Sequence, residues 1–169
     1  MKTFERLVVE QIPRLRRYAR ALTGDWGPAD DLVQETLARA MSRRRLWIRE
    51  KGVRPWLFTI LHNLYVNDVA RRARSPALVA ADENDARIAA GERADGGVVL
   101  RDLERALGEL SDEQREVVLL VGLEQLSYQE AAGVLGIPPG TVMSRLSRGR
   151  ERLRELMAGK DGAGLRRIK

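Results

Sequence analysis

The chain has 169 residues and a net charge of +6; 44% of its residues are hydrophobic and 32% are charged, with no cysteine and a single histidine. This composition is typical of a chain with a folded core, and it excludes a disulfide framework, a thiol nucleophile and a cysteine-ligated zinc site. The sequence has no apolar run of about 18 residues and no signal-peptide pattern, so we expect a cytoplasmic protein with no direct membrane insertion, no metal and no cofactor.

The positive charge is unevenly distributed along the chain. Residues 1–74 carry 16 basic and 8 acidic side chains and residues 131–169 carry 9 and 3, whereas residues 75–97 and 98–130 are both net acidic. Two arginine-rich blocks indicate a polyanion that is contacted at two places. A solvated surface without such a ligand is the alternative that charge alone leaves open.

The first block is predicted to form three helices, over about residues 4–22, 28–44 and 55–74. Gly24 allows the left-handed backbone that ends the first helix, and a proline opens each of the other two. Residues 75–97 are rich in Ala, Asp and Gly and have no sustained apolar stripe, which predicts a flexible linker.

The second block is predicted to form four helices, over about residues 98–110, 112–122, 128–135 and 139–157. Ser111 and Ser127 each begin a Ser-x-x-Glu/Gln capping box at the start of a helix. A short helix, a tight turn and a longer basic helix are typical of a helix-turn-helix. We therefore expect an all-α chain of two small helical domains, residues 1–74 and 98–169, joined by a flexible linker over residues 75–97.

The last predicted helix has an apolar side and a polar side. At about 100° per residue, the side expected to face the core carries Val142, Leu146, Gly149, Leu153 and Leu156. The opposite side and its flanks carry Met143, Ser144, Arg145, Ser147, Arg148, Arg150, Glu151 and Arg152. No acidic residue lies between Thr141 and Arg150, a pattern that favours docking on DNA over a solvated amphipathic helix.

The third predicted helix presents a second polar face. Thr59, Asn63 and Asn67 recur every four residues, away from the apolar stripe. Asparagine is a poor helix former, so two of them on one exposed face indicate hydrogen bonding to an external partner. Three arginines follow and provide an end that can bind phosphate: Arg71, Arg72 and Arg74.

Two further features of the first block each have two interpretations. Trp47, in the loop before the third helix, could stack on an unpaired base or fold onto the domain surface. An acidic face of the second helix is either a solvated helix start or a docking surface for a basic protein partner; it carries Asp30, Asp31, Gln34 and Glu35. The residues alone do not choose between these interpretations.

Three segments together resemble a known family. They are ADDLVQETLARA (29–40), RPWLFTILHNLYVNDVARR (54–72) and LSDEQREVVLLVGLEQLSYQEAAGVLGIPPGTVMSRLSRGRERL (110–153), and in order and separation they resemble the extracytoplasmic-function (group IV) sigma factors of bacterial RNA polymerase. The resemblance implies a protein that is not an enzyme and has no catalytic residues. It implies binding to core polymerase, at the clamp coiled coil and the flap, and recognition of promoter DNA under anti-sigma control.

The resemblance also implies a role for individual residues. Residues that would dock on the clamp coiled coil are Asp31, Gln34 and Glu35. Asn63, with the loop around Trp47, would capture a flipped base of the −10 element, and Asn67, Arg71 and Arg72 would follow the adjacent strand. Residues that would face the −35 element in the major groove are Met143, Ser144, Ser147 and Arg148. The linker would pass toward the active-site channel of the polymerase.

Three positions depart from the family pattern. Met143 stands where a basic residue is common, Ser111 where proline is common, and Gly149 where alanine is common, the last at a cost of about 1 kcal/mol in helix propensity. Two other functions remain open. One is a sigma-like decoy that sequesters an anti-sigma protein without binding DNA, and the other is a helix-turn-helix repressor that binds duplex DNA without polymerase.

Overall fold

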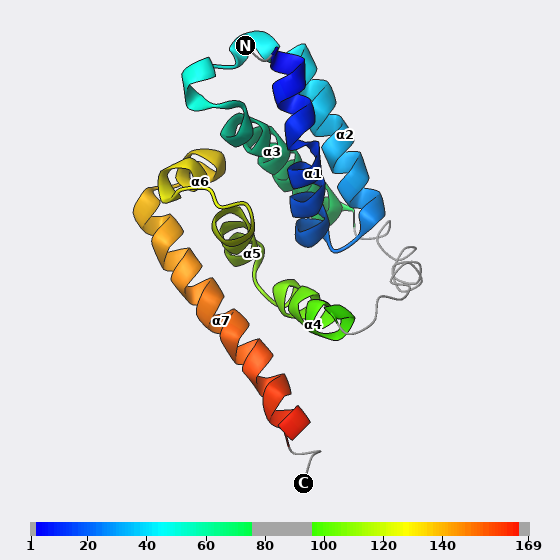
Figure 1. Ribbon diagram of the computed structural model, residues 1–169, viewed down its shortest axis with the longest axis vertical. Helices are drawn as coiled ribbons and strands as arrows, with labels where there is room; N and C mark the ends of the chain where they lie inside the picture. The colour runs from blue at the N-terminus through cyan, green and yellow to red at the C-terminus, as the bar shows by residue number, and fades with distance from the viewer. Residues whose placement is uncertain (1–2, 76–95, 166–169) are drawn as a thin grey trace. The chain divides into compact units, whose positions relative to one another are not determined.

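The computed structural model describes residues 3–75 and 96–165, and the regular structure in these ranges is helical throughout (Figure 1). The chain divides into two compact units, the first with α1–α3 and the second with α4, α5, most of α6, and α7. The expectation of an all-α chain is confirmed. Most of the predicted linker, residues 76–95, lies outside the described residues. Within the described ranges, no helix combines the length and the apolar character needed to cross a membrane.

The first unit is made of α1 (Phe4–Thr23), α2 (Trp26–Ser42) and α3 (Val53–Arg74), which contact one another pairwise. Gly24 ends α1 with a φ of 77°, the left-handed conformation that its sequence position predicts. The second helix begins at Trp26, earlier than expected, because the Asp25 carboxylate caps it by accepting a hydrogen bond from the Gly27 N–H at 3.4 Å.

An aromatic pair lies at the centre of the first unit. The rings of Tyr18 and Phe58 are both fully buried and meet edge to face, with centroids 5.1 Å apart. Leu15, Leu57 and Leu61 are fully buried as well. This core holds α3 by its Leu57–Leu61 side, so the Asn63 side of the helix is left exposed.

The second unit contains the predicted helix-turn-helix. Its helices are α4 (Gly96–Gly108), α5 (Asp112–Val118), the π-helical turn η4 (Leu119–Leu123), α6 (Tyr128–Leu135) and α7 (Pro139–Leu165). Both predicted caps are confirmed. The Gln114 N–H donates to the Ser111 hydroxyl at 3.2 Å, and Ser127 and Glu130 exchange side-chain-to-backbone hydrogen bonds of 2.9 and 3.1 Å.

Two predicted helix limits in this unit were wrong. The helix expected over residues 112–122 is α-helical only to Val118, after which the Leu119 carbonyl accepts from the Glu124 N–H, five residues on, at 2.9 Å. Hydrophobic periodicity does not distinguish such a wider turn from an α-helix. The last helix continues past residue 157 to Leu165. This extension contains glycines, whose low helix propensity predicts an earlier end.

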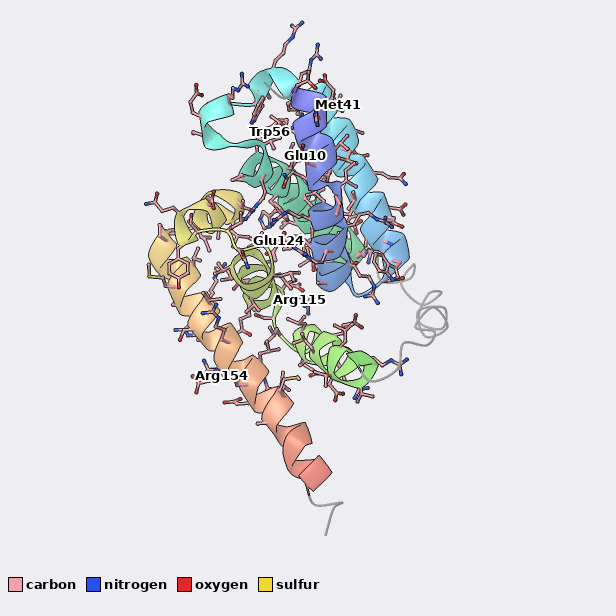
Figure 2. The ribbon with its side chains drawn as sticks, in the orientation of Figure 1. Glu10, Met41, Trp56, Arg115, Glu124 and Arg154 are labelled. Carbon is pink, nitrogen blue, oxygen red and sulfur yellow. The ribbon has the colours of Figure 1, made fainter. Side chains whose placement is uncertain are left out.

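Arg115 joins α4 to α5 (Figure 2). Its guanidinium donates to the carbonyls of Leu107, Gly108 and Leu110 at 2.8, 3.1 and 2.9 Å, and its side chain is only 13% exposed. The carbonyls at the end of a helix have no partner within that helix. One side chain on α5 therefore satisfies the C-terminal end of α4 and ties the two helices together.

Gly149 allows α7 to approach α5 closely. A Cβ atom at this position would lie 2.8 Å from Cγ2 of Val118 and 3.4 Å from Cβ of Gln114. The residue is buried on the same side of α7 as Val142 and Leu146. The loss of helix propensity that the sequence suggested is thus offset by a contact that a larger residue would obstruct.

Candidate nucleic-acid and polymerase interfaces

The outward side of α7 is built by the burial of its other side. Val142, Leu146 and Gly149 are buried, as the sequence predicted. The helix therefore presents to solvent four exposed residues, which we call the α7 reading face: Met143, Ser144, Ser147 and Arg148. Farther along the helix, Arg154 projects outward (Figure 2) and is also exposed.

The turn before α7 determines where this face begins. Gly136 adopts a φ of 66°, so α6 ends in the left-handed conformation that glycine tolerates best. The Pro138 carbonyl then accepts hydrogen bonds from the N–H groups of Thr141 and Val142 at 3.0 and 3.2 Å. Thr141 is half-buried in this first turn of α7. Its side chain is consequently less accessible than those of the α7 reading face.

The polar residues of α7 differ in how far they are engaged within the protein. The Ser144 hydroxyl donates to the Thr141 carbonyl at 3.1 Å, and Arg145 Nη2 lies 3.6 Å from a carboxylate oxygen of Glu113. Within the described part of the chain, Arg148 and Arg150 form no ion pair and are exposed. These two arginines therefore offer charge that is not already neutralised inside the protein.

The polar face of α3 is only partly open. Asn63 and Asn67 are exposed, and neither amide has a protein partner within the described residues. Thr59 is half-buried and its hydroxyl donates to the Pro55 carbonyl at 2.9 Å. The two asparagines are thus the available hydrogen-bonding groups of this face.

Asp68 pairs with two of the three arginines in the last turn of α3, and Arg74 is exposed. Its carboxylate accepts a hydrogen bond from Arg71 and lies 3.1 Å from Arg72 Nη2. The sequence reasoning overlooked this residue, although the Asp-x-x-Arg-Arg spacing that allows both pairs was visible. The cationic end of α3 is therefore weaker than its arginine content suggests.

Trp47 packs within the first unit and also lines a cavity. Its ring lies 5.3 Å from that of Phe4, centroid to centroid, and its indole N–H is buried with no acceptor among the described residues. The cavity has a volume of about 380 Å³ and is lined by Leu7, Trp47, Arg49, Gly52 and Val53. Folding of Trp47 onto its domain, one of the two sequence interpretations, is confirmed. The same side chain also forms part of the cavity wall.

The acidic face of α2 lies at the surface. Asp31 and Gln34 are exposed, and within the described residues neither has a protein partner. Glu35 is also exposed and accepts a hydrogen bond from Arg39, one turn further on, at 3.0 Å. The three residues predicted to dock on polymerase are thus all accessible. Across the ranges described, no cluster of three or more His, Asp or Glu side chains is placed to hold a metal ion.

Comparison with family models matches the two units separately. Residues 8–62 match the model described as the Sigma2 domain of PhyR, and residues 100–153 match that of Sigma-70, region 4. The second match contains α5, α6 and the buried and reading faces of α7, and the first contains α2 and the cavity-lining loop.

Whole-chain comparisons agree with this division. The chain is 34% identical to the ECF RNA polymerase sigma factor EcfG of Rhodopseudomonas palustris, an alignment that covers 89% of this chain and 82% of that protein. The structure is similar to that of the sigma factor RpoE of Bartonella quintana, solved with the anti-sigma factor NepR, at 33% identity and a TM-score of 0.81, covering 94% and 98% of the two chains. It also resembles CnrH, solved with the cytosolic domain of CnrY, at 27% identity and a TM-score of 0.69, covering 92% and 88%. The chain belongs to the extracytoplasmic-function sigma factors of bacterial RNA polymerase, which are transcription initiation factors without enzymatic activity.

Proposed function

We propose that this sigma factor binds core polymerase through α2, the −10 element through α3 and the adjacent loop, and the −35 element through α7. The domains that do so are residues 1–74 and 98–169. One observation carries the proposal: each unit has an exposed polar face whose side chains have no partner within the described residues. These side chains are Asn63 and Asn67 on the first unit and Ser147 and Arg148 on the second. Each face lies opposite a buried apolar side that orients it.

In the second unit, Arg148 is the main polar side chain that recognises a base of the −35 element. An arginine can donate two hydrogen bonds to one guanine edge, and Arg148 is exposed and not neutralised within the described residues. Ser147 supports base or phosphate contacts, and Arg150 supports phosphate contacts. Arg145 contributes only after its pair with Glu113 opens.

In the first unit, the cavity beside Trp47 receives a base from the melted −10 strand. Its volume is within the range of small-molecule pockets, and the Trp47 side chain forms part of its wall. Asn63 and Asn67 bind the neighbouring nucleotides, while Arg71 and Arg72 contact phosphates. Capture of bases in this way offsets the few kcal/mol lost when a base step unstacks.

Polymerase docking uses the exposed acidic face of α2. Asp31, Gln34 and Glu35 bind a basic surface of the clamp coiled coil, and the second unit contacts the flap. A negative patch inside a unit with 16 basic residues up to position 74 repels DNA, so it suits a protein partner. Because polymerase and promoter are in the cytoplasm, the protein acts there.

An anti-sigma protein is the proposed regulator. The RpoE and CnrH structures were solved as complexes with NepR and CnrY, respectively. A regulator of this kind would block both units at once, since blocking one would leave the other free to bind DNA or polymerase. We expect such a partner to compete with core polymerase for the purified chain.

Reconstitution of the holoenzyme tests this function. The full chain is mixed with bacterial core polymerase, and transcripts made from a fragmented genomic library of the source organism are mapped at their 5′ ends. The proposal expects starts preceded by a common pair of elements, and a chain with Asp31→Lys and Gln34→Lys should lose them with the fold intact. The control combines Glu104→Lys on α4 with Glu109→Gln just after it, two exposed positions where the same change of +3 in net charge is made.

The decoy function makes the opposite prediction. A decoy binds an anti-sigma protein but yields no promoter-dependent transcript, and removal of Arg148 or Asn63 leaves it unaffected. A repressor would shift duplex DNA tightly without polymerase at physiological salt. Either result would overturn the proposed function.

A further inference from the structure

Met143 is the apolar member of the α7 reading face. It is 50% exposed, whereas its apolar neighbours Val142 and Leu146 are buried. Single exposed apolar side chains are ordinary on protein surfaces, so exposure by itself assigns nothing. What distinguishes Met143 is its place among residues that face the DNA.

The position is one that meets base edges. Met143 is the fifth residue of α7 and lies one turn before Ser147, in the N-terminal part of the helix that enters the major groove in this motif. Ser144 directs its hydroxyl at the Thr141 carbonyl, and Arg145 directs Nη2 at Glu113. Because the Ser144 hydroxyl and the Arg145 guanidinium are engaged within the protein, Met143 is the side chain at this point of the helix that is free to meet a base edge.

The chemistry of the groove restricts what a thioether can face there. Guanine, adenine and cytosine present hydrogen-bond donors or acceptors in the major groove, and thymine adds a 5-methyl group. Covering a donor or acceptor with an apolar side chain costs free energy, because the group loses water and gains no partner. The long, adaptable Met side chain gains contact area against a methyl group without that cost.

We propose that Met143 is a specificity-determining residue that selects an A·T pair in the −35 element by packing against the thymine 5-methyl group. This rests on the proposed function, because it assigns a base preference to one member of the α7 reading face. It also accounts for an apolar residue at this position, because a phosphate or guanine contact would require a hydrogen-bond donor that methionine lacks.

Substitution of deoxyuridine for thymidine tests the contact, since uracil pairs as thymine does and lacks only the methyl group. On a promoter from the mapped starts, each thymidine of the −35 element, on either strand, is replaced in turn, and open-complex formation by the reconstituted holoenzyme is measured. One replacement should weaken the wild-type complex about fourfold, the effect of burying one methyl group. Met143→Ala should bind the thymidine promoter about as weakly and be insensitive to that replacement.

Arg148→Ala is the matched control. It should weaken the complex on every template yet retain the methyl effect at the position that Met143 reads. Alanine is the best helix former and Met143 is exposed, so Met143→Ala should keep the wild-type melting temperature. An equal methyl effect in wild type and Met143→Ala, no methyl effect anywhere, or a −35 element without thymine would overturn the inference while the proposed function stands. Failure of the wild-type holoenzyme to depend on any −35 sequence would instead overturn the proposed function.

Discussion

The two faces proposed to contact DNA differ in how their charge is balanced. On α7, residues 141–150 contain three arginines and no acid, and Arg148 and Arg150 are unpaired within the described residues. On α3, Asp68 pairs with both Arg71 and Arg72. The second unit is therefore suited to bind duplex DNA through charge. The first keeps fewer unpaired cations on α3, where Arg74 remains, and adds two neutral amides and a cavity lined in part by Arg49, which suit bases already exposed by melting.

The cores on which these two faces are built differ as well. The first unit is held by a buried aromatic pair between α1 and α3. The second has no aromatic side chain among its fully buried residues in the described ranges; its core is aliphatic, and Arg115 and the close approach at Gly149 add contacts between its helices. The α7 reading face should consequently be more sensitive to single polar or steric changes in its support.

The largest expected effect is the loss of Arg115. Arg115→Ala removes the guanidinium from the carbonyls of Leu107 and Gly108, at the end of α4, and of Leu110, just after it. We expect the second unit to lose about 3 kcal/mol of unfolding free energy. Hydrogen exchange should accelerate in α4 and α5 and stay unchanged in α1–α3. Arg105→Ala, whose side chain is 68% exposed, is the control and should cost less than about 0.5 kcal/mol. Equal losses in the two variants would refute the role of Arg115.

The next effect separates the two faces directly. Arg148→Ala should weaken the holoenzyme–promoter complex by about 1–3 kcal/mol and relax base preference at one −35 position. Arg72→Ala should cost less than about 1 kcal/mol, because Asp68 already neutralises part of its charge. Binding titrations at several salt concentrations measure both. A greater loss for Arg72→Ala would reverse the comparison between the units.

A pair of glycines tests the steric part of the comparison. Gly149→Ala places a Cβ atom against Val118 and should destabilise the second unit by about 1 kcal/mol, after the gain in helix propensity is included. Gly133→Ala, in α6 with no atom within 4 Å of the added Cβ, should stabilise the protein by about 0.5–1 kcal/mol. Thermal unfolding of the full chain measures whether each substitution lowers or raises the stability. Stabilisation by both would show that α7 can shift to accept the methyl group.

The sequence predicted what periodicity and local caps encode. The sidedness of α7, the Ser111 and Ser127 caps and the glycine that ends α1 are all present in the structure. The engagement of individual polar groups was not predictable in this way. That Arg145 faces Glu113, 32 positions away in sequence, depends on how α5 packs on α7, and the cavity at Trp47 depends on α1 reaching the loop.

The smallest expected effect is also the most specific to the first unit. Asp68→Asn removes the carboxylate shared by Arg71 and Arg72 and frees both for phosphates, so we expect a promoter complex tighter by about 0.5 kcal/mol at low salt. The gain should shrink as salt screens the charges. Glu109 is exposed and directly follows α4. Glu109→Gln makes the same change in net charge and should not tighten the promoter complex. If both variants bind equally tightly, overall charge accounts for the gain. If only Asp68→Asn binds more tightly, the Asp68 carboxylate is what weakens the cationic end of α3. The two units then differ because of this local ion pairing and not because of their arginine content.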